Sequence, residues 1–158
     1  MSEGNVPLLT AGDSAPDFQL ASGSGNTIRL REFRGRRVVL FFYPKDDTPT
    51  CTKEACSFQD HLGAILKKGA VVLGINADPP RTHARFSEKY GLRFPLLSDE
   101  TREVMKAFGV WKQKTLFGRR YKGIERTTFI LDESGIVTHI FRKVRVKRHL
   151  EDVLTALS

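Results

Sequence analysis

Two continuous apolar segments bracket a helix-like segment in the middle of the chain, and this order restricts the fold more than any other feature. Residues 38–43 and 71–76 are rich in β-branched and aromatic side chains, which is typical of strands buried on both faces of a sheet. Between them, residues 52–68 carry apolar side chains at intervals of three and four, which predicts an amphipathic helix ending before Gly69. The order strand, helix, strand predicts an α/β architecture.

Shorter elements complete a mixed central sheet flanked by helices. The other predicted strands are residues 17–20, 27–30 and 94–97; the other predicted helices are about 80–90, 100–108 and 147–157; and residues 127–131 and 136–141 form a predicted hairpin. No linker or repeat divides the 158 residues, so we expect one domain with residues 1–12 as a loose arm. Residues 109–126 have no regular pattern and are assigned to a loop.

The composition excludes several classes of protein. No segment approaches the roughly 20 apolar residues of a membrane-spanning helix, and residues 1–4 lack the basic-then-apolar order of a secretory signal. We therefore expect a soluble cytoplasmic protein. The net charge is +8, but the basic side chains alternate with apolar ones, as on an ordinary solvated surface, and no zinc-finger or RNA-binding motif accompanies them. No nucleic-acid partner is expected.

The two cysteines, Cys51 and Cys56, lie in the segment that joins the first apolar strand to the amphipathic helix. Two cysteines five positions apart cannot form the disulfide framework of a small secreted domain, so they indicate redox chemistry or a metal site. Cys51 lies at the predicted start of the helix, where unpaired backbone N–H groups and the positive end of the helix dipole favour a thiolate. Only the thiolate is a strong nucleophile, so Cys51 is the candidate reactive residue.

Helix geometry separates the two thiols. A rotation of 100° per residue places Cys51 in the apolar stripe of Ala55 and Phe58, whereas Cys56 lies about 140° away around the axis. Their Cα atoms would be roughly 8 to 9 Å apart on a helix. A disulfide needs Cα atoms closer than about 7 Å. A bond between these cysteines therefore requires the first turns of the helix to unwind.

The cysteine segment also resembles a known family. Pro44, Thr48 and Cys51 match the Pro-x-x-x-Thr-x-x-Cys motif of peroxiredoxins, and residues 43–56 are similar to the bacterioferritin comigratory protein branch, also called PrxQ. Further similarity is found at residues 15–18, 97–99, 126–132 and 146–157. Many relatives have glycine where this chain has Thr50, which is expected to adjust the loop without removing the chemistry. The resemblance implies a thioredoxin-like fold and a thiol-dependent peroxidase without a cofactor.

The resemblance also implies roles for individual residues. Cys51 would attack the peroxide and become a sulfenic acid, and Cys56 would resolve it as an intrachain disulfide that thioredoxin or a similar dithiol reduces. Thr48 would place its hydroxyl against the thiolate and the peroxide, and Pro44 would shield the sulfur from water. Arg126 would stabilise the thiolate and the leaving oxygen. Hydrogen peroxide and organic hydroperoxides are both candidate substrates.

Other interpretations remain open at this stage. A thiol–disulfide oxidoreductase is one, although such enzymes usually present Cys-x-x-Cys. A basic binding module with incidental cysteines is another, and a metal site is weaker because no histidine is suitably spaced. Glu54 is either a partner for an arginine near the site or a solvated helix charge, and the four histidines are taken as structural or surface residues. We expect a monomer, with a dimer through an exposed face as the alternative.

Overall fold

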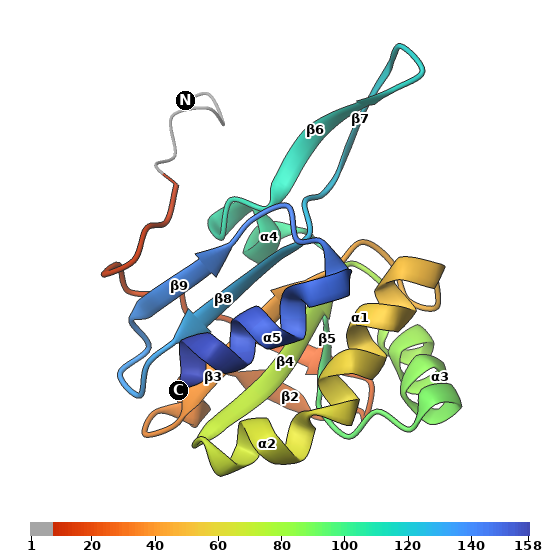
Figure 1. The fold of residues 1–158 in the computed structure, drawn as a ribbon. Helices are drawn as coiled ribbons and strands as arrows, with labels where there is room; N and C mark the ends of the chain where they lie inside the picture. Colours follow the sequence, from red (N-terminus) through yellow and green to blue (C-terminus); the bar gives the residue numbers. More distant parts are fainter. Residues whose placement is uncertain (1–7) are drawn as a thin grey trace.

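The computed structural model describes residues 8–158 and has a mixed seven-stranded sheet with helices on both faces (Figure 1). The strand order is β2-β1-β5-β4-β3-β8-β9, in which β3 is parallel to β4 and β4 to β5, and the other neighbours are antiparallel. The strands are β1 (Gln19–Ser22), β2 (Thr27–Arg29), β3 (Arg37–Phe42), β4 (Ala70–Asn76), β5 (Leu96–Ser98), β8 (Thr127–Leu131) and β9 (Val137–Phe141). The predicted α/β architecture with a mixed sheet is confirmed.

Five helices and one short 3-10 helix accompany the sheet in the described part of the chain. They are η2 (Leu30–Phe33), α1 (Pro49–Asp60), α2 (Leu62–Lys67), α3 (Pro80–Tyr90), α4 (Glu103–Ala107) and α5 (Val146–Leu157). The single helix predicted over residues 52–68 is instead two helices, interrupted at His61. It also begins three residues earlier than predicted, because Pro49 occupies the first helical position, where its missing N–H costs nothing.

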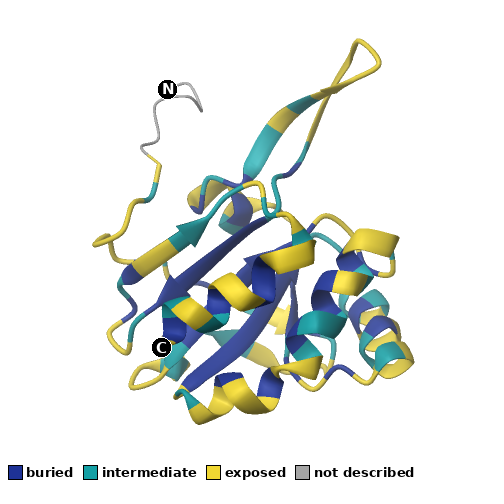
Figure 2. Cartoon of the chain, viewed as in Figure 1, coloured by how far each residue is buried: buried dark blue, intermediate teal, exposed yellow. Residues whose placement is uncertain are grey.

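Alternate residues of β3 face two separate cores, which is why this strand is apolar from Val38 to Phe42. The neighbouring strands β4 and β8 are buried along their whole length (Figure 2). Val39 and Phe41 pack with α1, α2, α3 and α5 on one side of the sheet, whereas Leu40 and Phe42 pack with residues around α4 on the other. The stripe of α1 that enters the first core includes Cys51. The helical period of α1 therefore places Cys51 in the interior of the protein.

Two regions differ from the expectations. Residues 109–126, assigned to a loop, contain a two-stranded hairpin, β6 (Trp111–Leu116) and β7 (Arg119–Ile124), which projects from the body of the molecule (Figure 1). Residues 1–7 of the predicted loose arm lie outside the described residues. The rest of the arm is not loose, because the Gly12 amide donates to the Val137 carbonyl and Arg142 donates to the Leu9 carbonyl. Within residues 8–158, no helix has the length and apolar character needed to cross a membrane.

Candidate active site

The pairing of β3 with β8 brings Cys51 and Arg126 together, although they are far apart in the sequence. Cys51 follows the carboxyl end of β3, and Arg126 directly precedes β8. Because β3 and β8 are antiparallel, with Phe42 opposite Thr127, the end of one strand lies beside the start of the other. Arg126, 75 residues along the chain, therefore lies at the same edge of the sheet as Cys51.

Cys51 is the third residue of α1 and is only 1% exposed. Thr48 is the N-cap residue, but its side chain does not cap the helix and donates instead to the Lys45 carbonyl at 2.8 Å. The backbone N–H groups of a helix's first turn have no intrahelical partner, and here no capping side chain competes for them. Their partial positive charge favours an anionic sulfur or a developing oxyanion at this position.

A chain of three charged or ionisable side chains defines the site. Arg126 donates through Nη2 to the Cys51 Sγ at 3.1 Å and through Nη1 to the Glu54 Oε1 at 2.6 Å. Glu54 is fully buried one turn after Cys51, so the interpretation as a solvated charge is wrong and the pairing with an arginine is confirmed. One guanidinium thus spans the sulfur and the carboxylate, which fixes its plane against the thiol.

Burial dominates the electrostatics of Glu54. The loss of hydration raises the pKa of Glu54 from 4.5 to about 7, although Arg126 acts in the opposite direction. The second carboxyl oxygen, Oε2, is buried and has no hydrogen-bond partner within residues 8–158, which accounts for the cost of ionising this group. The pKa of Arg126 is raised, because burial lowers it but the negative charges of Glu54 and Cys51 outweigh that effect. The guanidinium remains cationic.

Replacing Glu54 by glutamine is expected to change how stability depends on pH. Since the folded-state pKa of Glu54 is raised from 4.5 to about 7, its contribution to stability is fully present below pH 4.5 and is lost as pH rises through 7. At roughly 1.4 kcal/mol per pKa unit, this loss is about 3 kcal/mol. The E54Q variant should not show it. Urea unfolding of both proteins between pH 4.5 and 8 measures the difference.

The comparison must be made between variants because His149 has the opposite effect. Burial lowers the pKa of His149 from 6.5 to about 4, so its contribution is present above pH 6.5 and is lost as pH falls through 4. This slope is common to both proteins and cancels in the difference. A difference in unfolding free energy that stays constant across the range would show that the pKa of Glu54 is the same in the folded and the unfolded protein.

Cys56 lies on the same helix but is separated from Cys51. Both are free thiols, and both lie within the helical residues Pro49–Asp60, so the separation expected on a helix applies. Cys56 is half-buried, and burial together with the carboxylate of Asp60 raises the pKa of its thiol. The first turns of α1 must unwind before the two sulfurs can bond.

The remaining predicted residues lie on the loop before α1. Pro44 lies two residues after the end of β3 and is exposed, and Thr48 is half-buried with its hydroxyl hydrogen directed to the Lys45 carbonyl. The structure therefore brings Arg126 into direct contact with both Cys51 and Glu54, whereas Pro44 and Thr48 lie on the loop. Their effects on the sulfur stay predictions.

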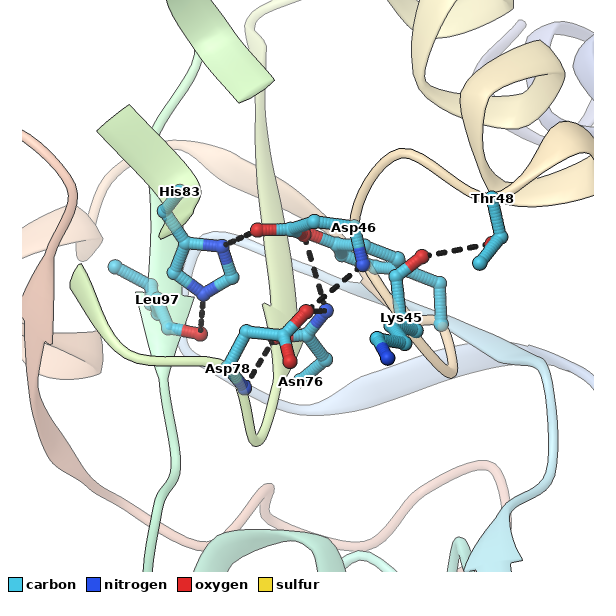
Figure 3. Close-up of polar contacts among 8 residues, drawn as sticks. Lys45, Asp46, Thr48, Asn76, Asp78, His83 and Leu97 are labelled. Atoms are coloured by element: carbon cyan, nitrogen blue, oxygen red, sulfur yellow. Dashed lines mark hydrogen bonds and ion pairs between the residues drawn. The ribbon is translucent and has the colours of Figure 1, made fainter. Parts of the chain in front are cut away.

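A second polar cluster, which was not predicted from the sequence, lies beside this loop. Asp46, Asn76, Asp78 and His83 form hydrogen bonds with one another at the ends of β3 and β4 and on α3 (Figure 3). His83 is 0% exposed. No periodicity or spacing in the chain signals this cluster, because its members come from three separate segments. Among residues 8–158, no group of three or more His, Cys, Asp or Glu is arranged to hold a metal ion.

Comparison with known proteins identifies the family. Residues 11–140 match the model of the AhpC/TSA family. The chain belongs to this family. It is 46% identical over 149 residues to a putative peroxiredoxin bcp of Coxiella burnetii, covering 94% of this chain and 99% of that protein. It is 43% identical to peroxiredoxin Bcp of Bacillus subtilis, with 94% and 95% covered.

A solved structure gives the same result for this peroxiredoxin. The bacterioferritin comigratory protein of Xanthomonas campestris, which has alkyl peroxide reduction activity, superposes with a TM-score of 0.85 at 41% identity, covering 89% of each chain. The expected thioredoxin-like fold and the resemblance to the bacterioferritin comigratory branch are confirmed. The family does not favour the interpretations as a thiol–disulfide oxidoreductase or a basic binding module.

Proposed function

We propose that this peroxiredoxin reduces hydrogen peroxide and organic hydroperoxides with Cys51 as the attacking residue. The observation that carries the proposal is the 3.1 Å contact between the Arg126 guanidinium and the Cys51 sulfur at the first turn of α1. A permanent cation and the helix N-terminus both favour the thiolate, which is the nucleophilic form of cysteine. No other thiol of the chain has these two neighbours.

The first step is a displacement on oxygen. The Cys51 thiolate attacks one peroxide oxygen, an S–O bond forms, and the O–O bond breaks. The second oxygen leaves with the electron pair and takes up a proton to become water or an alcohol, while the attacking sulfur becomes a sulfenic acid. Arg126 and the backbone N–H groups of the first turn stabilise the negative charge that moves onto the leaving oxygen. Both are already in place before the peroxide arrives.

The loop residues complete this site. We assign Thr48 the role of orienting the peroxide, since its hydroxyl oxygen keeps lone pairs that can accept a hydrogen bond. Pro44 follows β3 without an N–H donor and limits the access of water to the sulfur. A surface pocket of about 630 Å³ is lined by Arg126 and by residues that include Lys112, Tyr121 and Lys143. It gives room for the organic group of a bulky hydroperoxide.

The second step returns the enzyme to its thiol form. The Cys56 thiol attacks the sulfenic sulfur, a disulfide forms, and water leaves, after the first turns of α1 have unwound. A dithiol reductant, thioredoxin or a protein like it, then exchanges with this disulfide and restores both thiols. Because the resolving cysteine lies in the same chain, the cycle needs no second subunit, and we assign a monomer. We also propose a cytoplasmic location, which the need for a dithiol reductant supports, because thiols are kept reduced in the cytosol.

The function is tested by mixing fully reduced protein with one equivalent of hydrogen peroxide and following free thiols and intact mass. We expect rapid loss of both thiols and a mass lower by two hydrogens, because the sulfenic acid forms and then condenses with Cys56. Free cysteine under the same conditions gives the background rate. Thiol loss no faster than that background would show that the site does not activate Cys51 toward peroxide.

A further inference from the structure

The loop that leads to Cys51 is held by buried polar side chains that the peroxide chemistry does not use. Their centre is Asp46, which lies five residues before Cys51. The side chain of Asp46 is fully buried. Its Oδ1 accepts hydrogen bonds from the Tyr43 hydroxyl at 2.6 Å and from the Asn76 amide at 3.1 Å, and its Oδ2 lies 2.5 Å from His83 Nδ1. Figure 3 shows Asp46 between His83 and Asn76.

The partners of His83 define where its protons are. Nε2 lies 3.0 Å from the Leu97 carbonyl oxygen, and a carbonyl oxygen can only accept, so Nε2 carries a hydrogen. The other nitrogen faces the Asp46 carboxyl oxygen, and one proton lies between these two atoms. The pair is therefore joined by a short, charge-assisted hydrogen bond between two fully buried side chains. Such a bond holds the two groups in one geometry.

Further contacts tie the same loop to the end of β4 and to α3. The Asp46 amide donates to the Asp78 Oδ2 at 2.8 Å, which fixes the backbone as well as the side chain. Asp47 accepts from Lys89 and Tyr90 of α3, both at 2.8 Å. Thr48 donates to the loop's own Lys45. The firmly held segment thus ends directly before α1, the helix that must unwind.

We propose that Asp46 and His83 are positioning residues that hold the segment before Cys51 in place and so set the balance between peroxide reduction and disulfide formation. This inference rests on the proposed function. A fixed loop keeps Cys51 beside Arg126, which favours the reaction with peroxide, and it restrains the opening of the first turns, which slows condensation with Cys56. The balance has a chemical consequence. When condensation with Cys56 is slow, the sulfenic acid of Cys51 can react with a second peroxide molecule and become a sulfinic acid.

Two substitutions of His83 separate this role from simple structural support. Asparagine can place its amide nitrogen near the position of Nδ1, so H83N keeps the bond to Asp46 and loses the bond to Leu97. Glutamine reaches the position of Nε2, so H83Q keeps the bond to Leu97 and loses the bond to Asp46. Each variant lacks one buried hydrogen bond, which makes H83N the matched control for H83Q.

The measurement is rapid quenching after addition of hydrogen peroxide, with the thiol, sulfenic, disulfide and sulfinic forms counted by mass. For H83Q we expect Cys51 to react about tenfold more slowly and the disulfide to form about tenfold faster, at the lower end of the effect of losing a hydrogen bond to a charged group. The sulfinic form should decrease accordingly. H83N should remain close to the wild-type protein in both rates.

The proposal is overturned if H83Q and H83N behave alike, or if both rates of H83Q change in the same direction, as a general loss of stability would cause. Should H83Q not fold, D46N replaces it, because an amide at position 46 keeps the geometry and removes the charge. The same two opposite changes, smaller in size, are then expected, and unchanged rates would overturn the proposal. A wild-type protein that does not react with peroxide would contradict the proposed function itself.

Discussion

The Cys51→Ser variant is expected to lose the reaction with peroxide, with the second-order rate falling at least about 10³-fold, as for removal of a catalytic nucleophile. A serine hydroxyl has the size of the thiol but stays protonated near neutral pH, so it offers no anion to attack the O–O bond. The surrounding site is retained, because Arg126 can donate to the serine oxygen as it does to the sulfur at 3.1 Å. The measurement is peroxide consumption by the reduced protein.

Cys56→Ser is the matched control, since the same atom is exchanged five residues further along α1. Cys56 does not contact Arg126 in the described structure, so the first oxidation of Cys51 should proceed at the wild-type rate. The product should then remain as a sulfenic acid, detected as the gain of one oxygen, and turnover with a dithiol protein should stop. If C56S lost the first reaction and C51S kept it, the two cysteines would have exchanged roles.

The central strands could be predicted because burial on both faces leaves a direct trace in the sequence. β3 and β4 have apolar side chains at nearly every position, so both strands could be predicted without knowing their tertiary contacts. The break at His61 was not predictable from spacing, because Phe58, Leu62 and Ile65 continue the helical period through it. The β6–β7 hairpin was missed for a different reason. Its strands pair with each other and are mostly exposed, so no alternation of apolar and polar residues marks them.

The site could be predicted only in part, because a local sequence pattern shows which residues of an element are buried but not which distant segments meet. The position of Cys51 in the buried stripe of α1 follows from the helical period. Its contact with Arg126 depends on the antiparallel pairing of β3 with β8, which no local pattern specifies, and only the family resemblance pointed to this arginine. The burial of Asp46 and His83 likewise depends on three segments meeting, and an isolated histidine in a helix shows no sign of it.

The Arg126→Gln variant is expected to react with peroxide about 10²- to 10³-fold more slowly, the usual cost of removing one donor that stabilises developing charge. Glutamine cannot supply the positive charge that faces the sulfur and the leaving oxygen. The measurement is the second-order rate of Cys51 oxidation under single-turnover conditions. Arg119→Gln is the control, because it removes the same charge from an exposed position on the β6–β7 hairpin and should leave the rate unchanged.

The loss of Arg126 also leaves Glu54 without its partner, and this second effect must be separated from the first. An unpaired buried charge costs roughly 3–5 kcal/mol of unfolding free energy, unless the carboxyl group takes up a proton. The double variant E54Q/R126Q removes that cost, so it should recover stability in urea unfolding while the peroxide rate stays low. Recovery of both would mean that Arg126 acts only by neutralising Glu54. Recovery of stability alone would show that the guanidinium takes part in the reaction at Cys51. The peroxide rate would then stay low because the Cys51 sulfur has lost the donor that contacts it at 3.1 Å.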